Sequence, residues 1–289
     1  KVKRPFDSDL YQALNAEVIL LRARMTAIED YESSNFSKEK IGSLSKKEFI
    51  NFYELYCKTK KSNNQIDFAD LLDLCILMLK ENPVVAARIQ EQYHHFLVDE
   101  YQDNDPVQNE LLTQWLGARD SLCIVGDPRQ TIYSFKGAEP ALLNDFDKNF
   151  PNCITVELNR NYRSSPEIVN IANKLMHDTS ASGKAKLNLV SNQAQGPEPK
   201  ILKLDLETSE PAIIAEKIQV LIANKKIPFT QIAILLRVNS SISIFRQSLR
   251  ILGIPTKSPG DTFWEDVLPI IQKLEKSATS SKVDGIESL

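Results

Sequence analysis

The 289-residue sequence predicts an α/β protein that begins with an all-helical region. Residues 1–93 carry apolar side chains at helical spacing and contain no pattern of strand type. After residue 93, short apolar runs of strand length alternate with helical patterns, which is typical of βαβ units and a parallel sheet. Hydrophobic residues make up 42% and charged residues 25% of the chain, close to globular averages, so disordered, collagenous and coiled-coil chains are excluded.

The first two helices are predicted from apolar spacing and from a cap. One helix begins near Asp7, and its apolar face is formed by Leu10, Leu14, Val18 and Leu21. Ser45 and Glu48 have the spacing of a capping box, which predicts the start of another helix. The polar stretch 32–45 between them predicts a connecting loop.

Two further helices are predicted before residue 93. Asp67 is the expected cap of the first, whose apolar side is formed by Phe68, Leu71, Leu72, Cys75 and Leu79. Asn82-Pro83 places a capping side chain before a proline in the first turn, so the second helix follows there. Core packing accounts for all of these apolar faces.

The second part of the chain contains the predicted strands. They are the apolar runs at 95–99, 122–125, 154–158, 201–206 and 232–236. Helical patterns lie between most of them, at 106–115, 166–176, 211–223 and 241–252. Residues 180–199 are rich in Ser, Asn, Gln, Gly and Pro and predict a loop, and residues 277–289 predict a polar tail.

Charge and cysteine content limit the classes of function. Thirty-five basic and 38 acidic residues give a formal net charge of −3, so the composition by itself does not indicate a nucleic-acid-binding protein. The four cysteines lie far apart, and the chain has only three histidines. A metal centre and a disulfide framework are therefore not expected. The cysteine content instead favours a protein of the reducing cytoplasm. The longest apolar runs are far shorter than the ~20 residues of a membrane span.

Asp99 and Glu100 directly follow the predicted strand Phe96-Leu97-Val98. Parallel sheets bind ligands at the carboxyl ends of their strands, so both carboxylates lie where a ligand would be expected. In P-loop ATPases the first acid of such a pair holds Mg²⁺ and the second polarises the attacking water. The pair is also compatible with a solvated acidic turn.

Three further polar segments follow along the chain, and the first of them leaves the same predicted sheet edge. Val125 to Gln130 leaves a second strand, and Gln130 can orient a water or act as a turn residue. In 131–138, alternating aromatic residues and a lysine suit bases that stack on rings, although an ordinary half-buried strand has the same pattern. In 157–164, two arginines and a tyrosine precede a helix, which suits phosphate binding and base stacking, or equally a solvated loop.

Taken together, these segments closely resemble superfamily 1 DNA helicases of the UvrD/PcrA/Rep family. LVDEYQD (97–103) resembles the Walker B motif of that family, IVGDPRQTIYSFKGA (124–138) its third motif and LNRNYRS (158–164) its fourth. The segment 66–72 is similar to the one that precedes Walker B. The resemblance covers residues 10–252 and implies RecA-like parallel-sheet lobes of the P-loop NTPase type, here partial.

The resemblance also implies roles for individual residues. Asp99 would hold Mg²⁺ through its shell, Glu100 would activate the hydrolytic water, and Gln130 would sense the γ-phosphate of ATP. Tyr162 would stack on adenine, and Arg163 would reach the γ-phosphate from the second lobe. The residues expected to contact single-stranded DNA are Tyr133, Phe135 and Lys136. The family usually has tryptophan and arginine at the last two positions, and lysine lacks the planar fork of arginine.

Several parts of the family pattern are absent from this sequence. No Gly-x-x-x-x-Gly-Lys-[Ser/Thr] loop is present in this sequence. The only Gly-Lys pair, Gly183-Lys184, is followed by alanine and lies after the Walker B strand. The family's later motifs are also missing, and 260–264 matches its Gly-Gly-x-x-Phe segment only loosely. These absences indicate an internal slice of a longer helicase. Its expected parts are 1–93 from subdomain 1B, 94–157 from motor domain 1A, 158–276 from motor domain 2A, and a tail at 277–289.

The resemblance implies an ATP-dependent DNA helicase that moves 3′ to 5′ on single-stranded DNA and unwinds ssDNA/dsDNA junctions in repair or replication. It would be a bacterial-type cytoplasmic protein, associated with the nucleoid when working. The slice alone is expected to bind neither ATP nor Mg²⁺ tightly and to be inactive. Two alternatives stay open: a degenerate, non-enzymatic DNA-binding or scaffolding module, and a RecB-type helicase–nuclease subunit.

Overall fold

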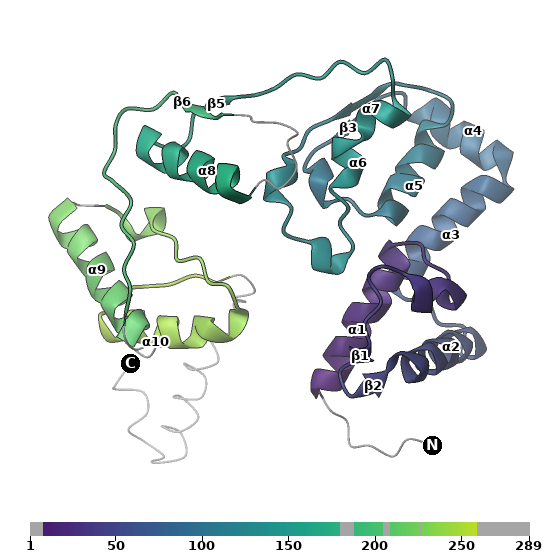
Figure 1. The fold of residues 1–289 in the computed structure, drawn as a ribbon, viewed down its shortest axis with the longest axis horizontal. Helices are drawn as coiled ribbons and strands as arrows, with labels where there is room; N and C mark the ends of the chain where they lie inside the picture. The colour runs from purple at the N-terminus through teal and green to yellow at the C-terminus, as the bar shows by residue number, and fades with distance from the viewer. Residues whose placement is uncertain (1–7, 180–187, 205–208, 226, 259–289) are drawn as a thin grey trace, which may run out of the picture. The chain divides into compact units, whose positions relative to one another are not determined.

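The computed structural model describes residues 8–179, 188–204, 209–225 and 227–258. The chain divides into two compact units, Lys1–Gly196 and Pro197–Leu289. Figure 1 shows the helices and strands of both units. The first unit begins with helices, as predicted: α1 (Ser8–Ala23), α2 (Lys46–Ser62), α3 (Phe68–Glu81) and α4 (Pro83–Gln92).

The predicted caps of α2 and α3 are confirmed. The Ser45 hydroxyl accepts a hydrogen bond from Glu48 N, and the Glu48 carboxylate accepts one from Ser45 N at 2.9 Å. Asp67 and Asp70 form the same reciprocal pair at the start of α3. The prediction for Asn82 is wrong in part: α4 begins at Pro83, but the Asn82 side chain donates to a carbonyl of α3 instead of capping α4.

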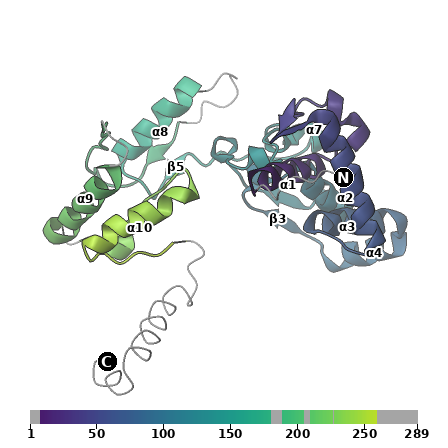
Figure 2. The same ribbon diagram turned by 90° about the horizontal axis from the view of Figure 1, so that it is seen from below.

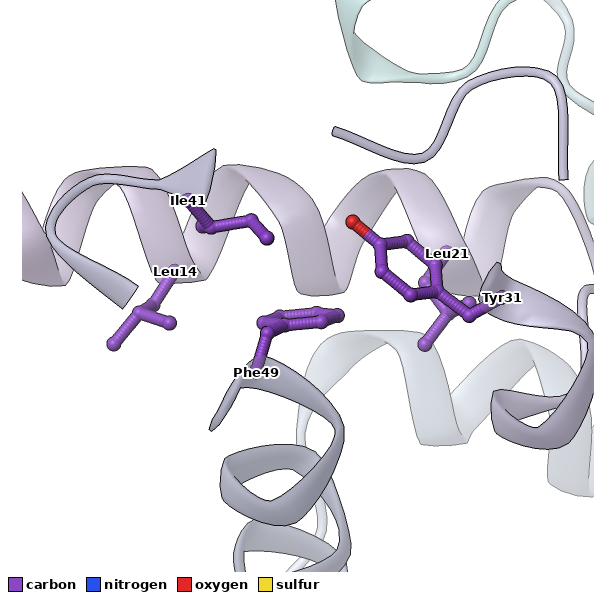
Figure 3. Close-up of a cluster of buried hydrophobic side chains, with 5 residues drawn as sticks. All are labelled: Leu14, Leu21, Tyr31, Ile41 and Phe49. Atoms are coloured by element: carbon purple, nitrogen blue, oxygen red, sulfur yellow. The ribbon is translucent and has the colours of Figure 1, made fainter. Parts of the chain in front are cut away.

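The predicted loop at 32–45 is wrong in its second half. Lys40–Ile41 (β1) and Leu44–Ser45 (β2) pair as an antiparallel hairpin, which turns at Gly42 with a positive φ of 58°. Two-residue strands are too short to show an alternating pattern, so no periodicity in the sequence indicates them. The hairpin places Ile41 in a buried cluster with Leu14, Leu21, Tyr31 and Phe49, which converge from α1, α2 and the 3₁₀ turn η1 (Ile28–Ser33) (Figure 3).

The predicted buried side of α3 is also largely wrong. Phe68 is 91% exposed, and Leu71 and Cys75 are exposed as well, whereas Ile76 and Leu79 are buried. They pack against Val107 and Leu111 of α5 (Pro106–Leu116). Apolar side chains lie on most sides of α3, so the spacing of these residues does not show which side is buried. Packing against α5 determines the buried side.

The predicted βαβ unit around the Asp-Glu pair is confirmed. Strand β3 (Phe96–Val98) pairs in parallel with β4 (Leu122–Ile124), and α5 connects them. The register pairs Phe96 with Leu122 and Val98 with Ile124. Both strands therefore end at the same edge, and the loops that follow them emerge together.

A second parallel pair, β5 (Arg160–Asn161) with β6 (Val190–Ser191), flanks α8 (Pro166–Thr179). The predicted strand at 154–158 is wrong, because these residues are irregular and Ile154 is 90% exposed. An extended run becomes a strand only beside a partner, and pairing starts two residues later. Its partner β6 lies inside the predicted loop 180–199, of which 180–187 fall outside the described residues. The short helices α6 (Ala141–Asn144) and α7 (Phe146–Asn149) lie between the two sheets in sequence.

The second unit is built around α9 (Glu210–Lys225) and α10 (Ile242–Ile251), which lie side by side (Figure 2). Its buried residues are Ala215, Ile218, Leu249 and Ile254. The predicted strands at 201–206 and 232–236 are wrong: 201–204 and 232–236 form no strand, and 205–206 lie outside the described residues. Ile232 and Ile234 pack on the helices, and Leu235 beside them is 94% exposed; in the part of the chain that the structure describes, no strand pairs with this run.

The predicted tail at 277–289 lies outside the described residues, as does 260–264. In the part of the chain that the structure describes, no helix has the length and apolar character needed to cross a membrane.

Candidate functional site

Asp99 and Glu100 follow β3 and are both exposed. Glu100 adopts a left-handed backbone conformation with φ 51°, which is uncommon for a residue other than glycine and costs about 1 kcal/mol or more. Its N–H donates to the Asp99 carboxylate at 2.9 Å. The sharp turn therefore presents two adjacent carboxylates at the end of a parallel strand.

Gln102 joins this turn to the loop that follows β4. Its side chain is 1% exposed, in the 3₁₀ turn η2 (Tyr101–Asp103). The Nε2 atom donates to Glu100 Oε2 at 2.6 Å, and the Oε1 atom accepts from Asp127 N at 3.0 Å. The backbone adds a bond from Tyr101 N to Val125 O at 2.9 Å. The two loops are thus one hydrogen-bonded structure.

Asp127 organises the second loop, which contains the 3₁₀ turn η3 (Pro128–Gln130). Its carboxylate accepts from Arg129 N and Nε and from Gln130 Nε2, each at 3.1 Å. Burial by itself raises the pKa of this carboxyl, but the hydrogen bonds from Gln130 and Arg129 outweigh it and hold the pKa below its usual value. Asp127 is therefore a carboxylate at neutral pH, and it orients the exposed Gln130 side chain.

Tyr133, Phe135 and Lys136 form a compact surface cluster. The two ring centroids lie 6.3 Å apart, and Lys136 Nζ lies 5.2 Å from the Tyr133 centroid and 5.8 Å from the Phe135 centroid. The alternative of a half-buried strand is wrong, because Ser134–Lys136 form the 3₁₀ turn η4 and all three side chains are exposed. Two accessible rings beside a cation offer stacking surfaces and a phosphate contact.

The same segment is anchored to α1 and to the loop after η2. Glu139 N donates to Asn104 O at 2.9 Å, and the Glu139 carboxylate forms an ion pair with Arg24. These bonds anchor the segment that carries the aromatic cluster to the end of α1 and to the loop after η2.

Tyr162 and Arg163 lie in the turn between β5 and α8. The Asn161 side chain accepts hydrogen bonds from Arg163 N at 3.0 Å and Ser164 N at 2.7 Å, so it shapes the turn before the helix. The Tyr162 side chain is exposed. An exposed ring and a neighbouring guanidinium on a braced turn can stack on a base and bind an anionic oxygen.

The segment after β6 braces this turn from the other side. Gln193 Nε2 donates to Tyr162 O, and the Ser191 hydroxyl donates to Ser164 O at 2.7 Å. Gly196 N donates to the Glu167 carboxylate at 2.9 Å. The Tyr162–Arg163 turn is thus held by residues about 30 positions later in the chain.

The structure brings some of the predicted site residues together and leaves others apart. Asp99, Glu100 and Gln130 belong to one hydrogen-bonded network, whereas the hydrogen bonds described for Tyr162 and Arg163 join them to Asn161 and to Gln193. The sequence reasoning missed three supporting residues: Gln102, Asn161 and Gln193. For Gln102 the available signal was a polar residue that directly follows a predicted acidic turn. For Gln193 the sequence offered none.

The donor set at Asp99 can be compared with the needs of Mg²⁺. Among the described residues, no group of three or more His, Cys, Asp or Glu side chains could hold a metal ion by itself. Mg²⁺ commonly binds through one or two carboxylates and completes its shell with water and nucleotide phosphates. The exposed Asp99 carboxylate therefore fits an ion that arrives with ATP.

The described residues form an α/β protein in which two neighbouring parallel strands end in an Asp-Glu turn and in a braced polar loop. Family models identify it further. The model described as UvrD/REP helicase N-terminal domain matches residues 3–151, and the UvrD-like helicase C-terminal domain matches residues 156–265. The chain belongs to the UvrD/Rep family of superfamily 1 helicases.

Individual relatives agree with this assignment. The ATP-dependent DNA helicase UvrD2 of Mycobacterium tuberculosis (strain ATCC 25618 / H37Rv) is 35% identical over 253 residues, which is 86% of this chain and 36% of UvrD2. UvrD1 of the same strain is 32% identical over 216 residues, or 72% of this chain and 28% of UvrD1. The helicase Rep of Buchnera aphidicola subsp. Baizongia pistaciae is 32% identical over 72% of this chain and 31% of Rep. The chain spans about a third of these relatives' length.

Proposed function

We propose that this chain is part of an ATP-dependent DNA helicase that uses ATP hydrolysis to move along single-stranded DNA and to open ssDNA/dsDNA junctions. The observation that carries the proposal is the Glu100–Gln102–Asp127–Gln130 network, which unites a strand-end carboxylate pair with a polar loop. Movement from 3′ to 5′, and work in repair or replication within the cytoplasm, follow from family analogy.

In this proposal, Asp99 holds the Mg²⁺ of the bound nucleotide and Glu100 takes a proton from the attacking water. The ion supplies charge neutralisation at the phosphates. Gln130 contacts the γ-phosphate, Tyr162 stacks on adenine, and Arg163 binds the γ-phosphate when the lobes close. Tyr133 and Phe135 stack on successive bases while Lys136 neutralises a phosphate.

The proposed parts are 1–93 as subdomain 1B, 94–157 as the second half of motor domain 1A, and 158–276 as the first part of 2A. This sequence contains no phosphate-binding Gly-Lys-[Ser/Thr] loop, so this part alone is expected not to hydrolyse ATP. The complete protein is expected to supply that loop.

The test compares ATP hydrolysis in the complete protein with and without Glu100→Gln. We expect turnover to fall by about 10² or more, because the amide cannot accept the proton, while ssDNA binding survives. Glu91→Gln, at an exposed glutamate on α4, is the matched control and should leave turnover unchanged. Normal turnover in Glu100→Gln would reject the assignment, and DNA-stimulated turnover by the 289-residue chain alone would reject the division into parts.

A degenerate, non-enzymatic DNA-binding module is the second candidate. The retained side chains of Asp99, Glu100, Gln130 and Arg163 speak against it, because a motor without turnover does not need all four. Absence of ATP hydrolysis in the complete protein, with ssDNA binding intact, would favour that candidate. A nuclease domain elsewhere in the complete protein would instead favour a RecB-type subunit.

A further inference from the structure

We propose that Gln102 is a positioning residue that couples the Glu100 carboxylate to the Gln130 side chain. The inference rests on the proposed function for the roles of Glu100 and Gln130, and it adds the connection between them. No role for Gln102 followed from the motif pattern.

Three consecutive hydrogen bonds make the connection. Gln102 Nε2 donates to Glu100 Oε2 at 2.6 Å, Asp127 N donates to Gln102 Oε1 at 3.0 Å, and Gln130 Nε2 donates to Asp127 Oδ2 at 3.1 Å. The path crosses from the loop after β3 to the loop after β4 and passes through only two intermediate residues.

Glutamine suits the central position because one amide is both donor and acceptor. The Glu100 carboxylate requires a donor, and Asp127 N requires an acceptor. A glutamate at 102 could not donate while ionised, and an apolar side chain could do neither. Gln102 is only 1% exposed, so water does not compete for either of its hydrogen bonds.

Gly126 keeps the amide of Gln102 in place. A Cβ atom at residue 126 would lie 2.6 Å from Gln102 Oε1, so a side chain at this position would displace the Gln102 amide. The amide is therefore clamped between the Gly126 backbone and the Glu100 carboxylate. A displacement of Glu100 moves the amide, and the Asp127 backbone that it holds carries Gln130 with it.

The test uses NMR on the 289-residue chain and needs no nucleotide. Glu100→Gln should shift the side-chain amide signals of Gln130 in the otherwise unchanged chain. The same substitution in a Gln102→Met background should produce no shift, because methionine fills the space without either hydrogen bond. Gln114→Met is the matched background: Gln114 also donates to a glutamate, Glu110, at 2.9 Å, so the Gln130 shift should persist there.

The proposal would be overturned if Glu100→Gln shifted the Gln130 side-chain amide signals equally in the native and Gln102→Met backgrounds. The effect of the substitution would then reach Gln130 through space and not through Gln102. A second measurement covers the case in which Gln102→Met does not fold. In the unchanged chain, a scalar coupling through the hydrogen bond should join Asp127 N to the Gln102 side-chain carbonyl, and its absence would also overturn the proposal.

Failures of the two proposals are distinguishable. A transmitted shift combined with normal turnover in Glu100→Gln rejects the catalytic assignment and keeps the coupling. Loss of turnover in Glu100→Gln without a Gln102-dependent shift keeps the catalytic assignment and rejects the coupling.

Discussion

Gly137 packs directly on Ala23 of α1: a Cβ atom at residue 137 would lie 2.4 Å from the Ala23 Cβ atom. Gly137 also has a φ of 110°, which only glycine adopts without strain. The end of the first helix is therefore the support for the turn that carries Tyr133, Phe135 and Lys136.

Gly137→Ala is expected to destabilise the first unit by about 1–3 kcal/mol, because the methyl group meets the rigid end of a helix and the backbone is strained. Urea unfolding measures the loss. Gly42→Ala is the control: its φ is 58°, but its Cβ would meet the flexible end of Leu10, so a smaller loss is expected. Equal losses would mean that contact with Ala23 contributes nothing.

Phe135→Ala is expected to weaken binding of a labelled single-stranded oligonucleotide by about 1–3 kcal/mol, because one stacking surface is lost. Phe135→Trp should preserve binding. The control is Phe68→Ala, which removes another exposed ring, on α3. Fluorescence anisotropy measures all three, and equal affinities would contradict the proposed DNA contact.

Lys136→Met is expected to reduce the salt dependence of the same binding, lowering the slope of log K against log[salt] by about 0.7 for one lost phosphate contact on a single strand. Anisotropy titrations at several salt concentrations give the slope. An unchanged slope, with weaker binding at every salt concentration, would instead indicate that Lys136 acts by holding the Tyr133 and Phe135 rings.

Lys38→Met is expected to cost about 1–3 kcal/mol of unfolding free energy, because the buried Glu17 carboxylate loses one of its hydrogen-bond donors. Lys38 Nζ lies 2.7 Å from Glu17 Oε2, and the Glu17 side chain is 0% exposed. Lys148→Met is the control, since Lys148 pairs with Asp145 at the surface and its loss should cost less than about 1 kcal/mol. Urea unfolding measures both losses of unfolding free energy. Equal losses for the two variants would contradict the role given to the burial of Glu17.

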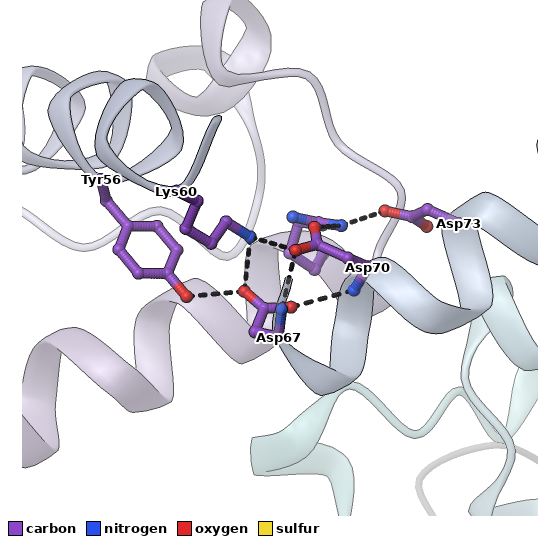
Figure 4. A network of polar contacts seen from close by, with 6 residues as sticks. Tyr56, Lys60, Asp67, Asp70 and Asp73 are labelled. Atoms are coloured by element: carbon purple, nitrogen blue, oxygen red, sulfur yellow. Dashed lines mark hydrogen bonds and ion pairs between the residues drawn. The ribbon is translucent and has the colours of Figure 1, made fainter. Parts of the chain in front are cut away.

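The network around Asp67 predicts a loss of stability in acid (Figure 4). Burial raises the pKa of Asp67, but hydrogen bonds from Lys60 Nζ and Tyr56 Oη, both 2.6 Å, outweigh it and hold the pKa well below its usual value. A carboxyl with a depressed folded pKa stabilises the fold above its unfolded pKa. That stability is lost as the pH falls below about 4.

Asp67→Asn is expected to remove this pH-dependent stability while keeping the cap of α3, because asparagine caps as well as aspartate does. At pH 7 the variant should be less stable by about 1–2 kcal/mol, and the difference between the two proteins should shrink as the pH falls below about 4. Urea unfolding across this pH range tests both statements. Parallel curves would show that Asp67 titrates alike in the folded and unfolded chains.

The helices and the polar residues at the strand ends could be predicted from the amino-acid sequence. The caps at Ser45 and Asp67 join residues three positions apart, so each is complete within one turn of chain. The Asp-Glu pair was likewise readable, because the buried run before it needs only the parallel neighbour that βαβ units supply. The family motifs are continuous in sequence, so the order of their residues is enough to identify them.

Which apolar runs form strands, and which polar residues support the site, depends on contacts between segments that are far apart in the sequence. The exposed run 154–158 forms no strand because none of the described segments pairs with it, whereas Arg160 and Asn161 pair with a segment 30 residues away. Gln102 reaches Asp127 across 25 positions, and Gln193 reaches Tyr162 across 31. Such contacts depend on where the folded backbone places each partner, which no local pattern specifies.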